Sequence, residues 1–521
     1  MASRAIFVFP PFRLDAANEQ LWRDSNLVDL RPKTFEVLLY LVQNSQRLVT
    51  KRELLDSVWA GASVSDELLR GYIRELRDAL GDDARKPGYI ETVPTRGYRF
   101  LPSVNESSAP TQHSKLKPAE LKPAKAPREL RVGILHSLTG TMALTESPVV
   151  DATLLAIEEI NERGGVLGRE IEPVVIDGAS DERAFARQAF ALIAEARVCT
   201  IFGCWTSASR KSVLPIVEQR DHLLIYPTQY EGMEQCSNIF YTGAAPNQQI
   251  IPAVSWAVGF LRKRRFFLVG WNSVYSRAAN AIIRDEVEAC GGEVVGEEYV
   301  LPDSTEVTRV VRTIAHTEPD LIFNSLVGDM NLFYTRLLRA AGITPEKIPT
   351  VYFSVGEIEL QSLSAREIVG DYASWNYFQS LDRPENHSFV KRFRARYGRQ
   401  RVVADTMEAG YLGVHLWAQA AQASDPDDVA AIRRALPNQS FEAPGGRVRI
   451  DAENQHTWKT MRLGRIVEGG QFEVVWSSEK PIRPEPWPGS RSPAAWKEFL
   501  NKLYEVWGGN WTKSQSAVSE G

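Results

Sequence analysis

Cysteine, methionine and histidine are scarce in this sequence of 521 residues, which contains 4 Cys, 6 Met and 7 His. The four cysteines form no CxxC pair, so neither a disulfide framework nor a zinc site is predicted. Because free cysteine behaves as a small hydrophobic residue, we interpret them as reduced core or surface thiols. They are Cys199, Cys204, Cys236 and Cys290.

Long hydrophobic runs are also missing. No window approaches the roughly 20 apolar residues that a membrane span needs. The segment MASRAIFVFPPFRLD (1–15) carries two prolines and an Asp where a signal peptide needs an unbroken apolar core. We therefore expect a cytoplasmic location and no membrane partner.

The phosphate-binding motifs GxGxxG and GxxxxGK[ST] do not occur in the sequence. The stretch NERGGVLGRE (161–170) is rich in glycine, but Gly164 and Gly165 are better interpreted as a helix C-cap that leads into a strand. We expect no nucleotide, no other cofactor and no metal ion. The net charge of −4 argues against a protein that coats nucleic acid along its whole surface.

The length predicts two or three domains, because a single hydrophobic core rarely extends over so many residues. Residues 104–127 consist mainly of Ser, Pro, Lys and Ala and predict a semi-flexible linker. We expect a DNA-binding domain over residues 1–103 and a ligand-sensing domain over residues 128–521.

Residues 5–30 alternate apolar and polar side chains in short bursts, which predicts a small antiparallel sheet. Three helical patterns follow. The first begins behind Pro32, and the second follows Thr50 and Glu53, which have capping-box spacing. The third covers residues 64–83.

The third helix is predicted to carry an apolar stripe on one face and a row of arginines on an adjacent face. The stripe consists of Leu69, Ile73, Leu76 and Leu80, and the row of Arg70, Arg74 and Arg77. Guanidinium groups on such a helix suit the major groove of DNA. The hairpin predicted over residues 89–100 places Arg96 at its tip, which suits a minor-groove wing. The alternative is a solvated charged helix beside an ordinary hairpin.

The order of these elements resembles the OmpR/PhoB-type winged helix-turn-helix, whose patterns VSDxxLRxxIxxLRxxLGDD and YIxTVxxRGYRF run through residues 64–100. The resemblance implies binding of double-stranded DNA through Arg70, Arg74, Arg77 and Arg96. We also expect a homodimer, because one winged helix makes a small footprint on DNA.

From residue 130 onward, apolar runs alternate with helical patterns, as in VGIL (132–135), FFLVGW (266–271) and TVYFSV (350–355). Nearly continuous Val, Ile, Leu and Phe predict strands buried on both faces, and hence parallel sheets covered by helices. The repeated unit is sufficient for two doubly wound α/β lobes. Between 203 and 249, such runs end in polar loops, an arrangement typical of a small-ligand pocket.

Several separated motifs resemble the urea-binding component of bacterial ABC importers and its relative, the cytoplasmic amide sensor. They are GCWTSASRK (203–211), YPTQYEGMEQ (226–235), IFYTGAAPNQQ (239–249), GDMN (328–331), SWNYFQSLDRPENHSFV (374–390), FEAPGGRVRID (441–451) and NQHTWK (454–459). Both relatives have the type I periplasmic-binding-protein fold, which holds a ligand between two lobes. The sequence carries features of each relative, so urea, acetamide and formamide stay open, with urea preferred.

The resemblance implies a ligand site at Trp205, Ser207, Tyr226, Thr228 and Tyr275, with Asp329 from the other lobe and Glu357 as a further candidate. Hydroxyls would bond the amide carbonyl, and a carboxylate would accept from its NH2 group. Each residue has a structural alternative: Trp205 as core, both tyrosines as packing between lobes, and Asp329 as a helix N-cap.

These patterns favour a one-component transcription regulator that senses urea or a short amide. A substrate-binding component of an importer is the alternative. An amide-cleaving enzyme is not expected, because neither Ser207 nor Cys204 has catalytic partners nearby in sequence.

Overall fold

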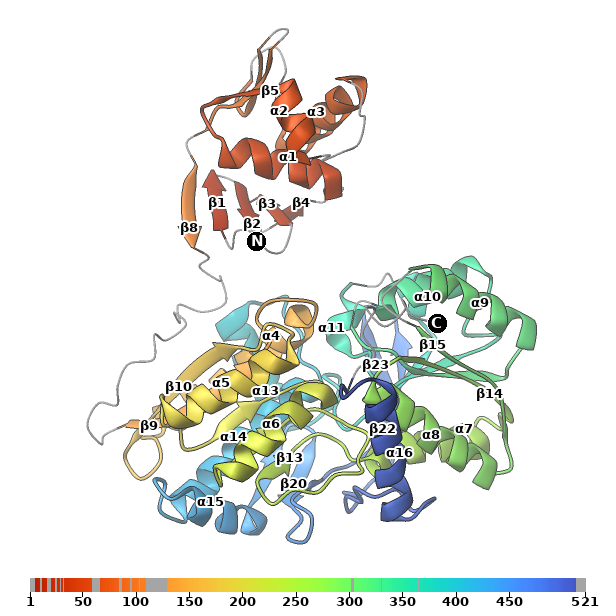
Figure 1. The fold of residues 1–521 in the computed structure, drawn as a ribbon. Helices are drawn as coiled ribbons and strands as arrows, with labels where there is room; N and C mark the ends of the chain where they lie inside the picture. The colour runs from red at the N-terminus through yellow and green to blue at the C-terminus, as the bar shows by residue number, and fades with distance from the viewer. Residues whose placement is uncertain are drawn as a thin grey trace. The chain divides into compact units, whose positions relative to one another are not determined.

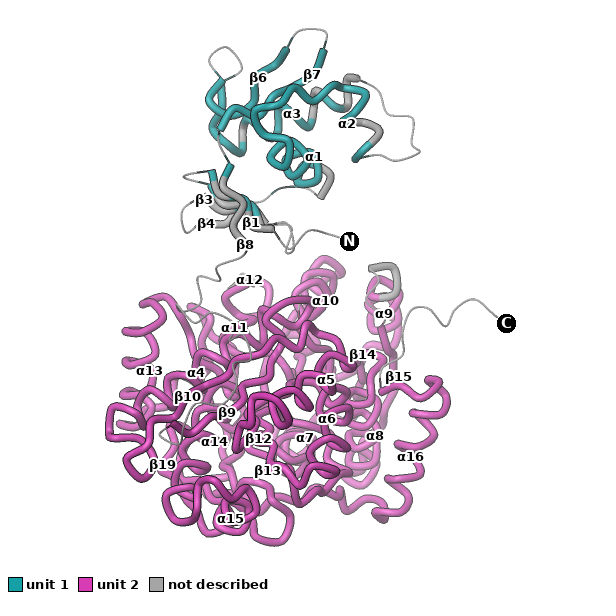
Figure 2. The backbone as a smooth tube through the Cα atoms, turned by 60° about the vertical axis from the view of Figure 1, so that its left-hand side comes forward, with its two compact units in different colours: residues 1–117 teal, residues 118–521 magenta. Residues whose placement is uncertain are grey.

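The chain divides into two units, residues 1–117 and 118–521 (Figure 2). In this computed structural model, the described residues are 5–9, 12–15, 20–23, 26–28, 30, 32–58, 66–83, 87–93, 96–102, 104–108, 129–300, 304–328, 330–362 and 365–511. The division falls inside the predicted linker. No described helix is long and apolar enough to cross a membrane.

The first unit begins with the antiparallel sheet expected from its alternating pattern. The strand order is β4-β3-β2-β1-β8. The strands are β1 (Ala5–Phe9), β2 (Phe12–Asp15), β3 (Gln20–Arg23), β4 (Asn26–Val28) and β8 (Asn105–Ser108).

Strand β8 corrects the predicted start of the linker. Residues 104–127 are too polar to suggest a folded element, yet Asn105–Ser108 pairs antiparallel with β1. Strand pairing uses backbone groups, so the edge of a sheet accepts a polar segment without requiring apolar side chains. The remainder of the predicted linker, from 109, lies outside the described residues.

Three helices follow the sheet, as predicted: α1 (Pro32–Gln43), α2 (Lys51–Val58) and α3 (Asp66–Leu80). The amide of Glu53 donates to the Thr50 hydroxyl at 3.2 Å, and the amide of Thr50 donates to the Glu53 carboxylate at 3.4 Å. This is the expected capping box. The predicted apolar stripe of α3 is fully buried in the core of this unit.

The predicted hairpin consists of β6 (Ile90–Val93) and β7 (Gly97–Phe100), and β7 also pairs with β5 (Leu48–Thr50). Gly97 is required by this sheet. A Cβ atom at that position would lie 2.0 Å from the carbonyl oxygen of Val49, so a side chain has no space.

The second unit contains two α/β lobes (Figure 1). The sheet of the first lobe is entirely parallel, with the order β10-β9-β11-β12-β13. Helices α4 and α14 pack on one face, and α5 and α6 on the other. The elements are β9 (Glu129–His136), β10 (Glu170–Asp177), β11 (Ile201–Gly203), β12 (Leu224–Tyr226), β13 (Ile239–Tyr241), α4 (Ala143–Glu162), α5 (Glu182–Ala194), α6 (Ser207–Gln219), α13 (Pro384–Tyr397), α14 (Asp405–Gln422), α15 (Val429–Ala435), β19 (Ser440–Ala443), β20 (Gly446–Ile450) and β21 (Thr457–Trp458).

The second lobe is built on a seven-stranded sheet with the order β15-β14-β16-β17-β18-β22-β23. Helices α7, α8 and α16 cover one face, and α9 and α10 the other. The elements are α7 (Ile250–Gly259), β14 (Arg265–Trp271), α8 (Val274–Ala289), β15 (Glu293–Val300), α9 (Ser304–Thr317), β16 (Leu321–Ser325), α10 (Met330–Ala340), β17 (Thr350–Tyr352), α11 (Glu357–Leu360), α12 (Ala365–Ile368), β18 (Tyr372–Trp375), β22 (Arg462–Val467), β23 (Gln471–Ser477) and α16 (Pro493–Val506).

The sheets confirm the predicted parallel arrangement, with one addition. Strands β22 and β23 join the second sheet antiparallel to their neighbours. The sequence pattern did not indicate this edge, because an antiparallel pair at the end of a parallel sheet leaves no distinct periodicity.

The chain crosses between the lobes three times, after β13, after β18 and after β21. Side-chain amides tie these crossovers together. Gln248 donates to the carbonyl of Thr457 at 2.9 Å, and Gln249 donates to the carbonyl of Ser374 at 2.8 Å. Asn376 donates to the carbonyl of Gln248 at 3.0 Å. Gln248, Gln249 and Asn376, which come from two of the sequence motifs, therefore build the hinge and do not line the pocket.

Candidate ligand pocket and nucleic-acid interface

A cavity of about 230 Å³ lies between the two lobes at the C-terminal ends of their parallel strands. This is where open α/β sheets bind ligands. The first lobe contributes Ser137, Thr141, Met142, Glu146, Ser180, Glu182, Phe185, Trp205, Thr206, Ser207, Ala208, Ser209, Thr228 and Gln229. The second lobe contributes Trp271, Ser273, Val274, Tyr275, Val327 and Trp511.

The structure brings four of the predicted ligand residues together around this cavity: Trp205, Ser207, Thr228 and Tyr275. Tyr226 lies behind the wall, where its hydroxyl donates to the carbonyl of Trp205 at 2.6 Å. It supports the loop that carries Trp205 and does not line the cavity. Asp329 lies outside the described residues.

Glu357 is also away from the cavity, at the start of α11. Its carboxylate accepts from the backbone amide of Gln379 at 2.6 Å. Burial raises the pKa of Glu357 to about 8, with Asp405 adding to the shift. Its bond to Gln379 holds the backbone just after the second crossover, and Glu357 is not among the described residues that line the cavity.

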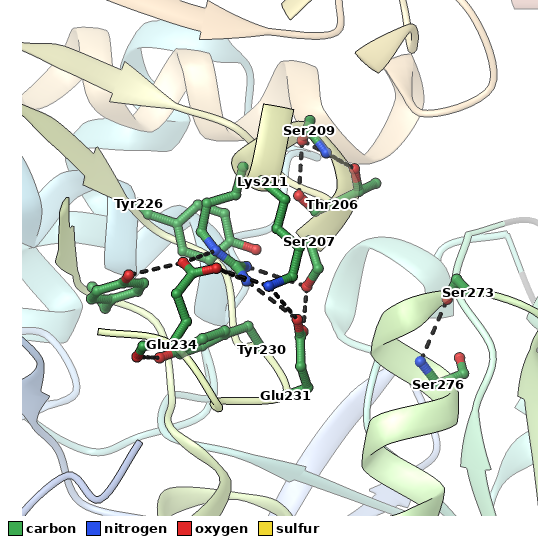
Figure 3. A network of polar contacts seen from close by, with 12 residues as sticks. Thr206, Ser207, Ser209, Lys211, Tyr226, Tyr230, Glu231, Glu234, Ser273 and Ser276 are labelled. Carbon is green, nitrogen blue, oxygen red and sulfur yellow. Dashed lines mark hydrogen bonds and ion pairs between the residues drawn. The ribbon is translucent and has the colours of Figure 1, made fainter. Parts of the chain in front are cut away.

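Ser207 begins α6, and its hydroxyl already forms two hydrogen bonds within the protein. It donates its proton to the carboxylate of Glu231 and accepts from Arg210 at 3.2 Å (Figure 3). A hydroxyl has one proton and two lone pairs. Ser207 can therefore offer a lone pair to a ligand N–H, whereas the sequence-based expectation was that it donates to a carbonyl.

Behind Ser207 lies a buried group of four charges: Arg210, Lys211, Glu231 and Glu234. Figure 3 labels Lys211, Glu231 and Glu234 of this group. Arg210 contacts Glu234 at 2.8 Å and Glu231 at 3.2 Å, and none of its surface is exposed. Burial acts to raise the pKa of Glu234, but the charges of Arg210 and Lys211 outweigh it and lower that pKa well below its ordinary value. The two cations balance the two anions and fix the loop at 226–235 against α6.

Three polar atoms of the cavity wall are buried without a hydrogen-bond partner: Thr228 Oγ1, Gln229 Oε1 and the Tyr275 hydroxyl. Buried polar groups normally find partners, so these three atoms are available to a ligand in the cavity. Burial raises the pKa of Tyr275, against the lowering effect of the neighbouring Ser354 and Gln229 side chains, and its hydroxyl therefore stays protonated and able to donate. Thr228 and Tyr275 stand on opposite lobes, so a single ligand can engage both lobes.

The electrostatics of the cavity favour an uncharged ligand. Among its described lining residues, none is Lys, Arg or His. Glu146 lines the wall, accepts from the amide of Ser137 at 2.8 Å and lies 3.0 Å from Nδ1 of the buried His136. A carboxylate ligand would meet this acid but no basic side chain among the described lining residues, whereas the indoles of Trp205 and Trp271 offer walls for a flat, weakly polar group.

On the first unit, the arginines of α3 have different environments. Arg74 is exposed, as is Arg96 beside the hairpin tip. Arg77 instead donates to the carbonyl of Ile90 and to the Thr92 hydroxyl, both at 2.8 Å. It ties α3 to the wing, so its predicted role in contacting DNA is not supported by its placement. The side chain of Arg70 lies outside the described part of the chain, as do residues 94–95 of the hairpin turn.

Comparison with known proteins agrees with this division. Residues 130–493 match the family described as "Periplasmic binding protein domain". The chain belongs to this family. Residues 25–100 match a second family, "Transcriptional regulatory protein, C terminal", over the winged helix that precedes the periplasmic binding protein domain.

Solved structures share the fold of the periplasmic binding protein domain. A solute-binding protein of an ABC transporter from R. palustris, in complex with benzoate, is 20% identical with a TM-score of 0.62, and the match covers 69% of this chain and 99% of that one. The branched-chain amino acid binding protein LivJ from Streptococcus pneumoniae, in complex with isoleucine, is 21% identical with a TM-score of 0.60, over 68% and 100%. At this identity the likeness shows the fold alone.

Three curated relatives each match a quarter or less of this chain. Transcriptional regulator HilA of Salmonella typhimurium is 33% identical over 130 residues, which are 25% of this chain and 23% of that protein. Transcriptional activator CadC of Escherichia coli is 35% identical over 83 residues, 16% of each chain. Limonene hydroxylase of Geobacillus stearothermophilus is 36% identical over 124 residues, 24% of this chain and 23% of that protein. The chain thus spans about a quarter or less of these relatives.

Sequence reasoning missed Gln229, Glu231 and Trp271. Gln229 and Glu231 follow Thr228 by one and three residues in the motif YPTQYEGMEQ. This spacing of polar residues along the loop was a usable signal. Trp271 ends β14 and was interpreted only as part of a buried strand.

Proposed function

We propose that this chain is a one-component, cytoplasmic transcription regulator whose periplasmic binding protein domain senses urea or a short carboxamide. Its winged helix binds double-stranded DNA, and two copies bind two half-sites as a homodimer. The observation that carries the proposal is the set of unpartnered polar atoms in a cavity whose described lining includes no basic residue.

A small amide complements these atoms. Its carbonyl accepts from the hydroxyls of Thr228 and Tyr275, and its NH2 group donates to Gln229 Oε1 and to the free lone pair of Ser207. Urea offers a second NH2 group, for which Glu146 is the acceptor on the wall. The volume of about 230 Å³ suits molecules of a few heavy atoms with accompanying water.

The proposed sensing of the ligand depends on a cavity wall to which both lobes contribute. A ligand that bonds both Thr228 and Tyr275 prefers the closed lobes, and this difference in affinity is what shifts the population of closed protein. In the proposed regulator, the closed state alters the affinity of the paired winged helices for DNA.

The test is calorimetric titration of the full chain with urea, formamide, acetamide and acetate. We expect binding of at least one neutral compound and none of acetate, which has the shape of acetamide but a negative charge. Binding of acetate as tight as that of acetamide would contradict the proposal. Selection of sites from random duplex DNA, with and without the bound amide, then tests the regulatory half.

A substrate-binding role in amide import is the second candidate, because the solved structures with this fold include ABC transporter solute-binding proteins. The winged helix on the same chain argues against it. Sequence-specific DNA selection by the full chain would decide in favour of the regulator.

A further inference from the structure

The C-terminal segment packs on the second lobe and contributes Trp511 to the lining of the cavity. Helix α16 packs against α8, and Arg491 ahead of it forms a two-pronged ion pair with Asp285 on α8, at 2.7 and 2.6 Å. Trp496 within α16 is fully buried in the core of the second lobe. Figure 1 shows α16 in dark blue beside α8. The base of this segment is therefore fixed to one lobe.

Beyond α16 the chain reverses and places Trp511 over the cavity. Gly508 and Gly509 have positive φ angles of 65° and 79°, which let the backbone turn back sharply. The carbonyl of Trp511 accepts from the amide of Val274 at 3.1 Å, and its ring lies 4.5 Å from that of Tyr504. Both contacts hold the tryptophan to the second lobe.

The indole of Trp511 also contacts the first lobe. The ammonium group of Lys211 on α6 lies 4.8 Å from its ring centroid, a cation–π contact. Lys211 is itself held by Glu234 at 2.9 Å, within the buried charge group behind Ser207. One half-buried side chain thus lines the cavity and touches both lobes.

We propose that Trp511 is the specificity-determining roof of the cavity: its indole limits the length of ligand that the closed lobes accept. The proposal rests on the proposed amide-sensing function for the identity of the ligand. A limit on ligand length set by Trp511 requires only that a ligand occupies the cavity when the lobes are closed. The carbonyl and NH2 groups of the ligand bond to Thr228, Gln229 and Tyr275, and the alkyl end of the ligand points toward the indole of Trp511.

The test uses the full chain and the series formamide, acetamide, propionamide and butyramide. We expect wild-type affinity to fall with chain length. Because one methylene in a close-fitting apolar pocket changes affinity roughly tenfold or more, Trp511→Ala should shift the butyramide-to-acetamide affinity ratio by at least about tenfold toward butyramide. Trp511→Phe, which keeps a smaller ring, should lie between the two.

Trp487→Ala is the matched control. Trp487 is also half-buried on the C-terminal segment and also contacts a lysine, Lys497 at 5.5 Å, but it does not line the cavity. It should leave the ratio unchanged. An unchanged butyramide-to-acetamide affinity ratio in Trp511→Ala, or an equal shift of that ratio in Trp487→Ala, would contradict the assignment of Trp511 as the specificity-determining residue.

A ligand-independent measurement separates this proposal from the proposed function. In ligand-free protein, hydrogen exchange at the Val274 amide should be faster in Trp511→Ala than in wild type and unchanged in Trp487→Ala. If no amide binds the wild type, amide sensing fails while the exchange result still decides whether Trp511 secures the segment to the cavity. Exchange at the wild-type rate in Trp511→Ala would overturn that anchoring.

Discussion

Ser207 donates its hydroxyl proton to Glu231, and the same oxygen accepts from Arg210. A ligand-facing residue is thereby bonded directly to a buried ion group. The position of the Ser207 lone pair depends on Arg210 remaining charged and in place, so the group acts as a rigid support for one side of the cavity.

Removing Arg210 should be strongly destabilising. Arg210→Met leaves the buried carboxylate of Glu231 without its guanidinium, and breaking a buried pair in this way costs about 3–5 kcal/mol in the free energy of unfolding. Denaturant titration of the full chain measures it. The control is Arg396→Met, whose ion pair with Glu158 is roughly half exposed and should contribute less than about 1 kcal/mol.

Tyr275→Phe should affect affinity and stability in opposite directions. The unpartnered hydroxyl is costly in the ligand-free protein, so its removal should leave stability equal or higher while amide affinity falls by about 1–3 kcal/mol. Tyr334 on α10 supplies a matched control, because its hydroxyl is also buried and unpartnered but lies away from the cavity lining. If Tyr334→Phe weakens amide binding as much, the assignment of Tyr275 is wrong.

Substitutions of Arg74 and Arg77 should have different effects, because Arg74 is predicted to contact DNA and Arg77 supports the wing. Arg74→Ala should lower affinity for a selected DNA site by about 1–3 kcal/mol with an unchanged melting temperature. Arg77→Ala removes the bonds to Ile90 and Thr92, so it should lower the thermal stability of the winged helix. Fluorescence anisotropy on DNA beside thermal melts measures both, and a stability loss confined to Arg74→Ala would reverse this assignment.

Glu357 should make stability depend on pH. Its folded-state pKa of about 8 lies above its ordinary value of 4.5, so the folded state holds this proton more tightly than the unfolded chain. Its contribution is full below pH 4.5 and is lost as pH rises to about 8, at up to roughly 1.4 kcal/mol per pH unit. Glu357→Gln should reduce this slope in denaturant titrations and leave amide affinity unchanged, whereas Glu170→Gln, at an exposed position, should keep the slope. A residual slope is expected from Asp371, because burial raises its pKa to about 7.

The fold was predictable where a pattern repeats along one element. The stripe through Leu69 and Leu80 and the capping box at Thr50 are local, so sequence spacing determines them. The strand Asn105–Ser108 is not local, because it forms only when β1 offers an open edge. The antiparallel strands β22 and β23 were hidden because their side chains follow no regular alternation of buried and exposed positions.

The pocket was only partly predictable. Resemblance led to Trp205, Ser207, Thr228 and Tyr275, since each follows or begins an element at the sheet edge. It could not show that the proton of Ser207 is already used. Nor could it show that Trp511, more than 230 residues after Tyr275, would reach the same cavity, because such a contact is set by the path of the whole chain.

The ties between the three crossovers are buried: they include the side-chain amides of Gln248, Gln249 and Asn376, and the contacts of Lys459 and Arg462 with backbone carbonyls. The cavity lining has no described basic residue. Dissolved ions screen such buried contacts hardly at all. Binding of arginines to DNA phosphates, by contrast, weakens steeply as salt rises, because counterions compete. In the proposed regulator, the ionic strength of the cell would therefore set how tightly the chain holds DNA without changing how much amide closes the lobes of the DNA-free protein.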